Sequence, residues 1–188
     1  MTTGIIITEG PDACGKSTLQ NYFVEHFEAV SMHLTYPAPS PYKDMFDYQL
    51  QKLQEAVLYA RNKLVIVDRH WISEMIYAKV FRGGSPWPDM PRIMSEEWAK
   101  NHAIYILCVP YSLDDTCKRH RENLDPNHPY DDAKFTELLI EYQDFAEEAI
   151  STRNDMMTYT IEDEGEDLEM FCEEAIDFLF WNQTRSII

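Results

Sequence analysis

The sequence predicts an α/β fold, a three-layer α/β/α sandwich with a five-stranded parallel sheet and a short lid. Five short apolar runs alternate along the chain with segments whose apolar residues recur at helical spacing. The runs are almost wholly apolar, as parallel strands are when helices cover both faces of their sheet. The most unusual polar residues follow these runs, at the strand ends where such sheets bind ligands. At 188 residues, 45% of them hydrophobic, the chain suits a single domain over 1–188.

The first strand is predicted at residues 4–8, and the helix that follows carries Leu19, Phe23 and Phe27 at helical spacing. Between them the chain meets every position of the pattern G-x-x-x-x-G-K-[ST]. The residues concerned are Gly10, Pro11, Asp12, Ala13, Cys14, Gly15, Lys16, Ser17 and Thr18. A glycine loop in this position turns backbone N–H groups toward a phosphate at a helix N-terminus. The alternative is a chance match to a degenerate pattern, but the flanking strand and helix favour nucleotide binding.

This motif predicts a P-loop NTPase fold with ATP and Mg²⁺ as cofactors. By its mechanism Lys16 reaches the β- and γ-phosphates, and the Ser17 hydroxyl completes the shell of a bridging Mg²⁺ ion. Asp12 is unusual inside such a loop, because a carboxylate is repelled by phosphates unless it contacts a sugar hydroxyl or an arginine. We therefore expect Asp12 to bind the substrate.

The second strand is predicted at 30–36, and the prolines of 37–41 end it because they cannot continue a ladder. A helix from about 42 to 62 follows, with apolar residues at steps of four and three. The third strand, 64–68, is apolar until Asp68, and a helix is predicted over 69–82.

The glycines and prolines of 83–91 form a loop that carries Trp87, and a short helix is expected around 95–101. The fourth strand is predicted at 102–109 and a further helical start at Ser112. A long helix then carries Phe135, Leu138, Leu139, Tyr142, Phe145 and Ala149.

The last strand is predicted at 156–161, before a closing helix whose apolar residues face the sheet. Polar positions between Glu162 and Asp177 are nearly all acidic, as on a solvated helix face.

The net charge and the apolar runs limit the partners. The formal net charge of −17, from 16 basic and 33 acidic residues, opposes binding to a long nucleic acid. No apolar run approaches the roughly 18 residues of a membrane helix, and the first residues do not resemble a signal peptide. The four cysteines show neither a C-x-x-C pair nor zinc-type spacing, which indicates reduced thiols. We expect a cytoplasmic protein with small-molecule partners and no membrane.

Asp68 and Arg69 form a second candidate site. A carboxylate at the end of the third strand can lie beside the phosphate loop and hold Mg²⁺ or its water. The alternative, a helix N-cap aspartate followed by a surface arginine, is compatible with that role. Arg69 would grip an acceptor phosphate with two parallel hydrogen bonds.

The basic cluster of Lys118, Arg119, His120 and Arg121 precedes a segment rich in Pro, Asn and His. Phosphoryl transfer needs cations that offset charge on the moving group, and a closing lid commonly supplies them. We predict such a lid over about 114–132. The alternative is a basic helix end that balances the acidic residues near it.

Tyr36, Trp71 and Trp87 are candidates to stack on a base, although aromatic residues at strand ends often belong to the core. His70 and His120 could likewise either contact a ligand or belong to the core.

Together these residues resemble the thymidylate kinase branch of nucleoside and nucleotide kinases over nearly the whole chain. The loop from Glu9 to Thr18 is similar to that family's E-G-x-D-x-x-G-K-S-T, and Asp68-Arg69-His70 is similar to its D-R-Y. The resemblance implies that Asp12 approaches the sugar, that Arg69 binds the acceptor phosphate, and that the protein is a homodimer. Asp68-Arg69-His70 is also similar to viral thymidine kinases, whose acceptor is a nucleoside.

Two departures from the family pattern stand out. Tyr36-Pro37 lies where the family has Phe-Pro. In the family an arginine follows this pair and helps to hold the monophosphate, whereas this chain has Ala38 there. Ala13 means that the phosphate loop brings no catalytic arginine, so Arg119 or Arg121 should supply one.

The resulting hypothesis is ATP- and Mg²⁺-dependent phosphoryl transfer to a deoxynucleoside monophosphate, dTMP or a related pyrimidine nucleotide. Catalysis is assigned to Lys16, Asp12, Asp68, Arg69, Arg119 and Arg121, metal binding to Ser17 and Asp68, and substrate binding to Asp12, Tyr36, Arg69, His70 and Trp71. One alternative is a deoxynucleoside kinase of the thymidine type. Another is a regulatory P-loop NTPase switch, although the guanine-reading Asn-Lys-x-Asp is missing.

Overall fold

A computed structural model describes residues 2–35, 40, 44–84, 97–99, 102–123, 131–160 and 166–185. Its centre is a five-stranded sheet of order β2-β3-β1-β4-β5, in which every pairing is parallel. The strands are β1 Gly4–Glu9, β2 Val30–His33, β3 Leu64–Asp68, β4 Ala103–Cys108 and β5 Met156–Tyr159. The predicted parallel sheet is confirmed.

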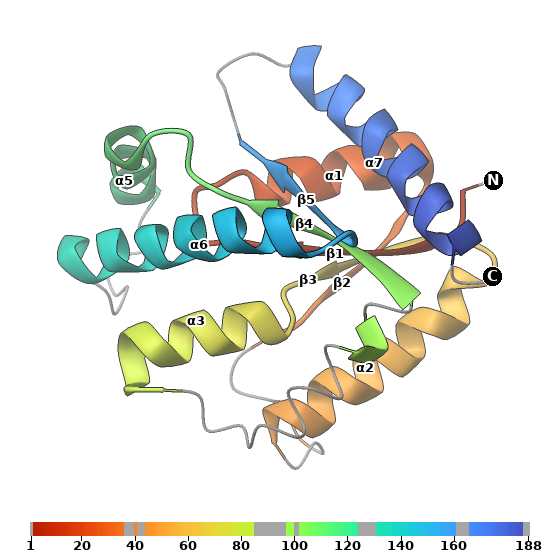
Figure 1. Ribbon diagram of the computed structural model, residues 1–188, viewed down its shortest axis with the longest axis horizontal. Coiled ribbons are helices and arrows are strands. Elements are labelled where there is room, and N and C mark those ends of the chain that lie inside the picture. Colours follow the sequence, from red (N-terminus) through yellow and green to blue (C-terminus); the bar gives the residue numbers. More distant parts are fainter. Residues whose placement is uncertain are drawn as a thin grey trace.

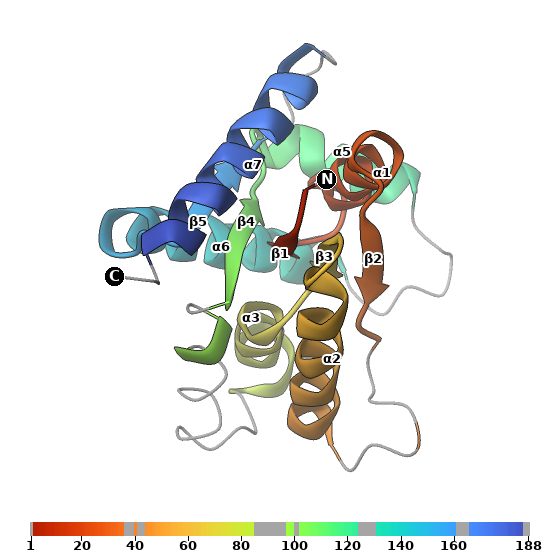
Figure 2. The same ribbon diagram turned by 90° about the vertical axis from the view of Figure 1, so that its right-hand side faces the viewer.

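Helices cover both faces of this sheet. They are α1 Lys16–Phe27, α2 Met45–Ala60, α3 Trp71–Arg82, α5 Leu113–Glu122, α6 Asp132–Thr152 and α7 Glu166–Arg185. Figures 1 and 2 show α1 and α7 packed on one face, and α2, α3 and α6 on the other. The predicted three-layer sandwich is therefore confirmed. Among the described residues, no helix has the length and apolar character needed to cross a membrane.

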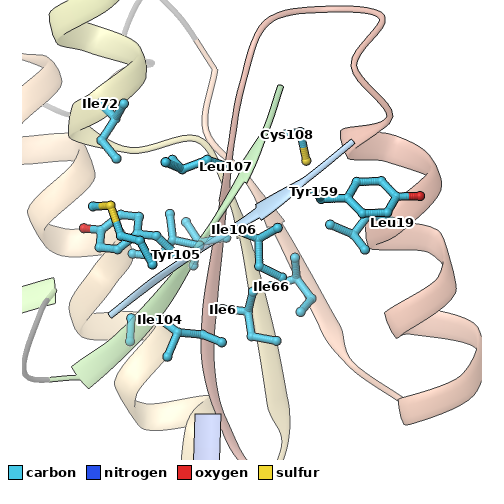
Figure 3. Packing of buried hydrophobic residues seen from close by; sticks show 14 of the residues in the cluster. Ile6, Leu19, Ile66, Ile72, Ile104, Tyr105, Ile106, Leu107, Cys108 and Tyr159 are labelled. Carbon is cyan, nitrogen blue, oxygen red and sulfur yellow. The ribbon is translucent and has the colours of Figure 1, made fainter. Parts of the chain in front are cut away.

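The core explains why the strands are so uniformly apolar. Every residue of β1, β3 and β4 is buried, because each of these strands has a neighbour on both sides and a helix layer above and below. Figure 3 shows Tyr105 and Ile72 on one side of the sheet, and Leu19 and Tyr159 on the other. All four cysteines are buried and free of disulfides.

Some boundaries differ from those predicted. Strand β2 ends at His33 rather than at residue 36, and β1 extends to Glu9. Helix α3 begins at Trp71 rather than at 69, because Arg69 has a left-handed φ of 72° that cannot continue a helix. The N-cap of α3 is His70, so the alternative that placed Asp68 at the helix cap is wrong.

Parts of the prediction lie outside the described residues. They are Tyr36, the proline segment after it, Trp87 and its loop, and residues 124–130 of the predicted lid. The remainder of that lid comprises α5 and the start of α6.

Candidate functional site

The loop between β1 and α1 has the backbone of a phosphate cradle. Gly10 has a φ of 145°, Ala13 of 62° and Gly15, the N-cap of α1, of 83°. A Cβ atom on Gly10 would lie 2.2 Å from the carbonyl oxygen of Cys108, so no other residue fits there without a backbone shift. Residues with left-handed φ let successive N–H groups point to one side, as anion-binding loops require.

Lys16 spans this loop. Its Nζ donates to the carbonyl oxygen of Pro11 at 2.7 Å and lies 3.9 Å from Oδ1 of Asp12. Burial lowers the pKa of Lys16, and the charge of Arg69 lowers it further. Ser17 and Thr18 are exposed at the start of α1, whereas Cys14 is buried and burial raises its pKa to about 12. The loop therefore offers a ligand its backbone, one ammonium and two hydroxyls.

Arg69 joins this loop to a second site. Its Nη2 donates to Oδ1 of Asp12 at 2.6 Å and its Nη1 to the carbonyl oxygen of Gly10 at 3.0 Å. The guanidinium lies 5.0 Å from the centre of the Tyr77 ring. The side chain is 19% exposed, so an incoming anion can still reach it. Of the two partners that the sequence left open for Asp12, a sugar hydroxyl or an arginine, the structure shows an arginine, Arg69.

Glu9 is a buried carboxylate that the sequence analysis did not assign to the site. It accepts hydrogen bonds from the backbone N–H of His70 at 2.8 Å, from that of Ser73 at 3.2 Å, and from the Ser73 hydroxyl. Burial raises the pKa of Glu9 to about 7, against the lowering effect of Ser73 and Arg69. Glu9 therefore ties the end of β1 to the turn that carries Arg69. An acid at the end of an apolar strand was the available signal, as at Asp68.

Asp68 pairs with Thr8 of β1 in the sheet register. Thr8 comes two residues before Gly10, the first residue of the loop. Its Oδ2 accepts a hydrogen bond from Nδ1 of His33, whereas its Oδ1 is buried and has no partner within the described residues. A buried carboxylate oxygen without a partner fits a hard cation such as Mg²⁺. No group of three or more metal-ligating side chains occurs in the described part of the chain.

A cavity of about 530 Å³ opens beside Arg69. It is bounded by the end of β2, by α2, by the turn after β3 and by α3. Gln49 of α2 is 3% exposed, and its Oε1 is buried without a partner among the described residues. Across the lining, Nη2 of Arg82 pairs with Oε1 of Glu74 at 2.6 Å. Sequence reasoning missed these three residues, because each also fits the pattern of an amphipathic helix.

His70 and Trp71 are both buried. His70 is 0% exposed, and burial lowers its pKa to about 3, which keeps the ring neutral. It contributes to the wall of the cavity. Trp71 is 3% exposed, and its Nε1 donates to the hydroxyl of Tyr105 at 3.0 Å. The indole therefore packs in the core, which was the alternative to base stacking for aromatic residues at strand ends.

The basic cluster divides into separate environments on α5. Nη2 of Arg119 donates to Oγ1 of Thr116 at 3.3 Å, while its Nε is buried without a partner in the described structure. Burial raises the pKa of Cys14, and the positive charge of Arg119 is among those that lower it. Arg119 is therefore close enough to the phosphate loop to act on Cys14. Arg121 instead pairs with Asp132 at an exposed site, 3.3 Å from Nε to Oδ2. His120 stacks on Phe135. Arg119 is therefore the better placed of the two predicted lid arginines.

No family model and no curated protein matches this chain. Among solved structures it is similar to the YorR protein of Bacillus subtilis in complex with phosphorylated GDP, with 21% identity, a TM-score of 0.68, and 96% and 98% of the two chains covered. It is also similar to deoxyadenosine kinase from M. mycoides with bound dATP, with 14% identity, a TM-score of 0.62, and 92% and 99% covered. The same kinase with bound dCTP gives 15% identity, a TM-score of 0.56, and 92% and 98% covered. At these identities the likeness shows that the chain shares the fold of these proteins, and no more.

Proposed function

We propose that this protein is an ATP- and Mg²⁺-dependent kinase that phosphorylates a deoxynucleoside monophosphate, dTMP or a related pyrimidine nucleotide. One observation carries the proposal: the phosphate loop and a 530 Å³ cavity meet at the Asp12–Arg69 pair. A switch or simple NTPase needs the loop but not a second site beside it. A phosphotransferase needs both, because donor and acceptor must be held close together and in line.

The donor would occupy the loop. Lys16 exchanges its bond to the Pro11 carbonyl for phosphate oxygens, and the loop amides hold the remaining charge. Ser17 and Asp68 would hold Mg²⁺, which when bound neutralises charge on the β- and γ-phosphates. Arg119 would stabilise the transferring group from α5, as the absence of a loop arginine requires.

The acceptor would occupy the cavity with its phosphate toward Arg69. The planar guanidinium can bind two phosphate oxygens, and Asp12 is then released to accept from a sugar hydroxyl. The Gln49 carboxamide presents one donor and one acceptor group, and the Glu74–Arg82 pair presents a carboxylate and further N–H donors. Such groups match the hydrogen-bonding edge of a base. The described lining thus supports a nucleotide, and the pyrimidine preference rests on the family resemblance.

A deoxynucleoside acceptor is the second candidate, favoured by the likeness to deoxyadenosine kinase. Its hydroxyl must lose a proton, whereas a phosphate acceptor needs no such step. Asp12 or Asp68 would be the base, and loss of transfer to nucleosides only, on replacement of one of them by asparagine, would support this candidate.

The test is ADP release from ATP and Mg²⁺, measured with a panel of deoxynucleosides and their monophosphates and with Lys16→Ala as the blank. Turnover on a monophosphate that Lys16→Ala abolishes supports the proposal and identifies the base. Arg69→Lys keeps the positive charge but loses the planar guanidinium that can donate two parallel hydrogen bonds. It should raise the acceptor KM at least 10-fold while leaving the ATP KM within about threefold of the parent. Turnover only on nucleosides would favour the second candidate, and hydrolysis without any acceptor would favour a switch.

The homodimer implied by the family resemblance is part of the same proposal. Light scattering on the purified protein measures it directly, and a monomer at assay concentrations would contradict it.

A further inference from the structure

His33 occupies an unusual place for a residue that contacts a buried carboxylate. It is the last residue of β2, an edge strand of the sheet, and its side chain is 59% exposed. A side chain exposed to this extent contributes little to the core. Its Nδ1 nevertheless donates to Oδ2 of Asp68, a carboxylate that is only 11% exposed. The strand register aligns the two residues, since His33 pairs with Asp68 across β2 and β3.

We propose that His33 is a positioning residue, which holds the Asp68 carboxylate with Oδ1 available to the nucleotide-bound Mg²⁺. The inference rests on the proposed function and adds a residue to which neither the phosphate-loop motif nor the Asp-Arg motif assigns a role. The hydrogen bond from His33 does not require a charged ring, because the Nδ1–H group of either a neutral or a charged imidazole can donate it.

The terminal torsion of an aspartate is broad and roughly two-fold, so the residue itself does not fix which oxygen faces a ligand. In Asp68 the two oxygens differ: Oδ2 is bound by His33, and Oδ1 is buried without a partner in the described residues. The histidine therefore makes one oxygen the anchor and leaves the other as the available ligand.

Carboxylates that ligate metals are commonly held by a hydrogen bond to their second oxygen, and loss of such a partner typically costs 10- to 100-fold in metal affinity. Mg²⁺ demands near-ideal geometry, so it is sensitive to the angle of a ligand. The effect of His33 should therefore appear in metal binding rather than in metal-free nucleotide binding.

The experiment measures Mn²⁺ binding to the protein–ADP complex by electron paramagnetic resonance, and metal-free ADP binding by calorimetry in EDTA. His33→Leu removes the donor at similar size, whereas His33→Asn places an amide N–H near the position of Nδ1. Ser31→Ala, on the same face of β2 and also exposed, controls for changes to the edge strand. Thermal unfolding of each variant reports on folding.

We expect His33→Leu to weaken Mn²⁺ binding at least 10-fold. His33→Asn and Ser31→Ala should stay within about threefold of the parent, and metal-free ADP affinity should be unchanged in all three. Unchanged Mn²⁺ affinity in His33→Leu, or equal losses in the leucine and asparagine variants, would overturn the inference while leaving the proposed function intact. An effect on the acceptor KM alone would also overturn it, because His33 would then act on the acceptor. If the parent protein binds neither ADP nor Mn²⁺–ADP, the proposed function itself fails.

Discussion

The buried carboxylate of Glu9 should make the stability of this protein depend on pH in an unusual direction. Burial raises its pKa from the ordinary 4.5 to about 7, so the folded chain holds this proton more tightly than the unfolded chain does. Stability from a raised acid pKa is greatest below the unfolded value and falls as pH rises toward the folded value. The shift corresponds to about 3 kcal/mol of unfolding free energy, lost between about pH 4.5 and pH 7.

Glu9→Gln isolates this contribution, because glutamine does not titrate and has nearly the same size. The free energy of unfolding of each protein is measured by urea denaturation, followed by circular dichroism, at several pH values from about 4.5 to 8. Other groups titrate equally in both proteins, so they cancel in the difference between parent and variant. That difference should move by about 3 kcal/mol in favour of the variant as pH rises.

The size of the difference at any one pH is not the test. The Glu9 carboxylate accepts three hydrogen bonds, whereas glutamine has only one acceptor oxygen. The variant is therefore expected to lose some unfolding free energy by the same amount at every pH. Glu147→Gln, at an exposed position on α6, shows the effect of the same substitution outside the core. A difference between parent and Glu9→Gln that stays flat within about 0.5 kcal/mol, or that moves the opposite way, would refute the reasoning.

Two further predictions concern the core and the loop. Trp71→Phe removes the N–H that donates to Tyr105, and should cost about 1–3 kcal/mol of unfolding free energy with the acceptor KM unchanged. A large rise in the acceptor KM without loss of stability would show that the indole binds substrate. Gly10→Ala adds a Cβ that meets the Cys108 carbonyl at 2.2 Å, where φ is also unfavourable. It should therefore lower ATP affinity at least 10-fold by calorimetry, and an unchanged affinity would show that the loop adapts.

The fold could be predicted because its signals are local. Strands buried on both faces appear as continuous apolar runs, and helices that cover a sheet show apolar residues at steps of three and four. The phosphate loop adds a motif whose backbone requirements limit the residue types at each position. That Asp12 needs a partner was also predictable, because a carboxylate inside a phosphate loop is repelled by phosphates; the sequence favoured a substrate contact, and the structure adds the pair with Arg69.

Other parts of the site could not be predicted, because they depend on which elements become neighbours. Gln49 and Glu74 occupy buried faces of two helices, and only the packing of α2 and α3 around one cavity shows that they share a site. The bond from His33 to Asp68 depends on the register between strands that are far apart in sequence. Trp71 was assigned to the substrate because a strand-end aromatic can serve either the core or a ligand, and burial decides between them.

The backbone around Arg69 connects this residue to the phosphate loop. A left-handed φ at a residue other than glycine costs on the order of 1 kcal/mol, so the surrounding contacts must maintain it. The N–H of Arg69 donates to the carbonyl oxygen of Thr8 at 2.9 Å, and the next residue donates to the Glu9 carboxylate. Both acceptors belong to β1, the strand that leads directly into the phosphate loop. The loop and Arg69 are therefore both supported by β1, and under the proposed kinase function this shared support would hold the donor and acceptor sites at a set separation.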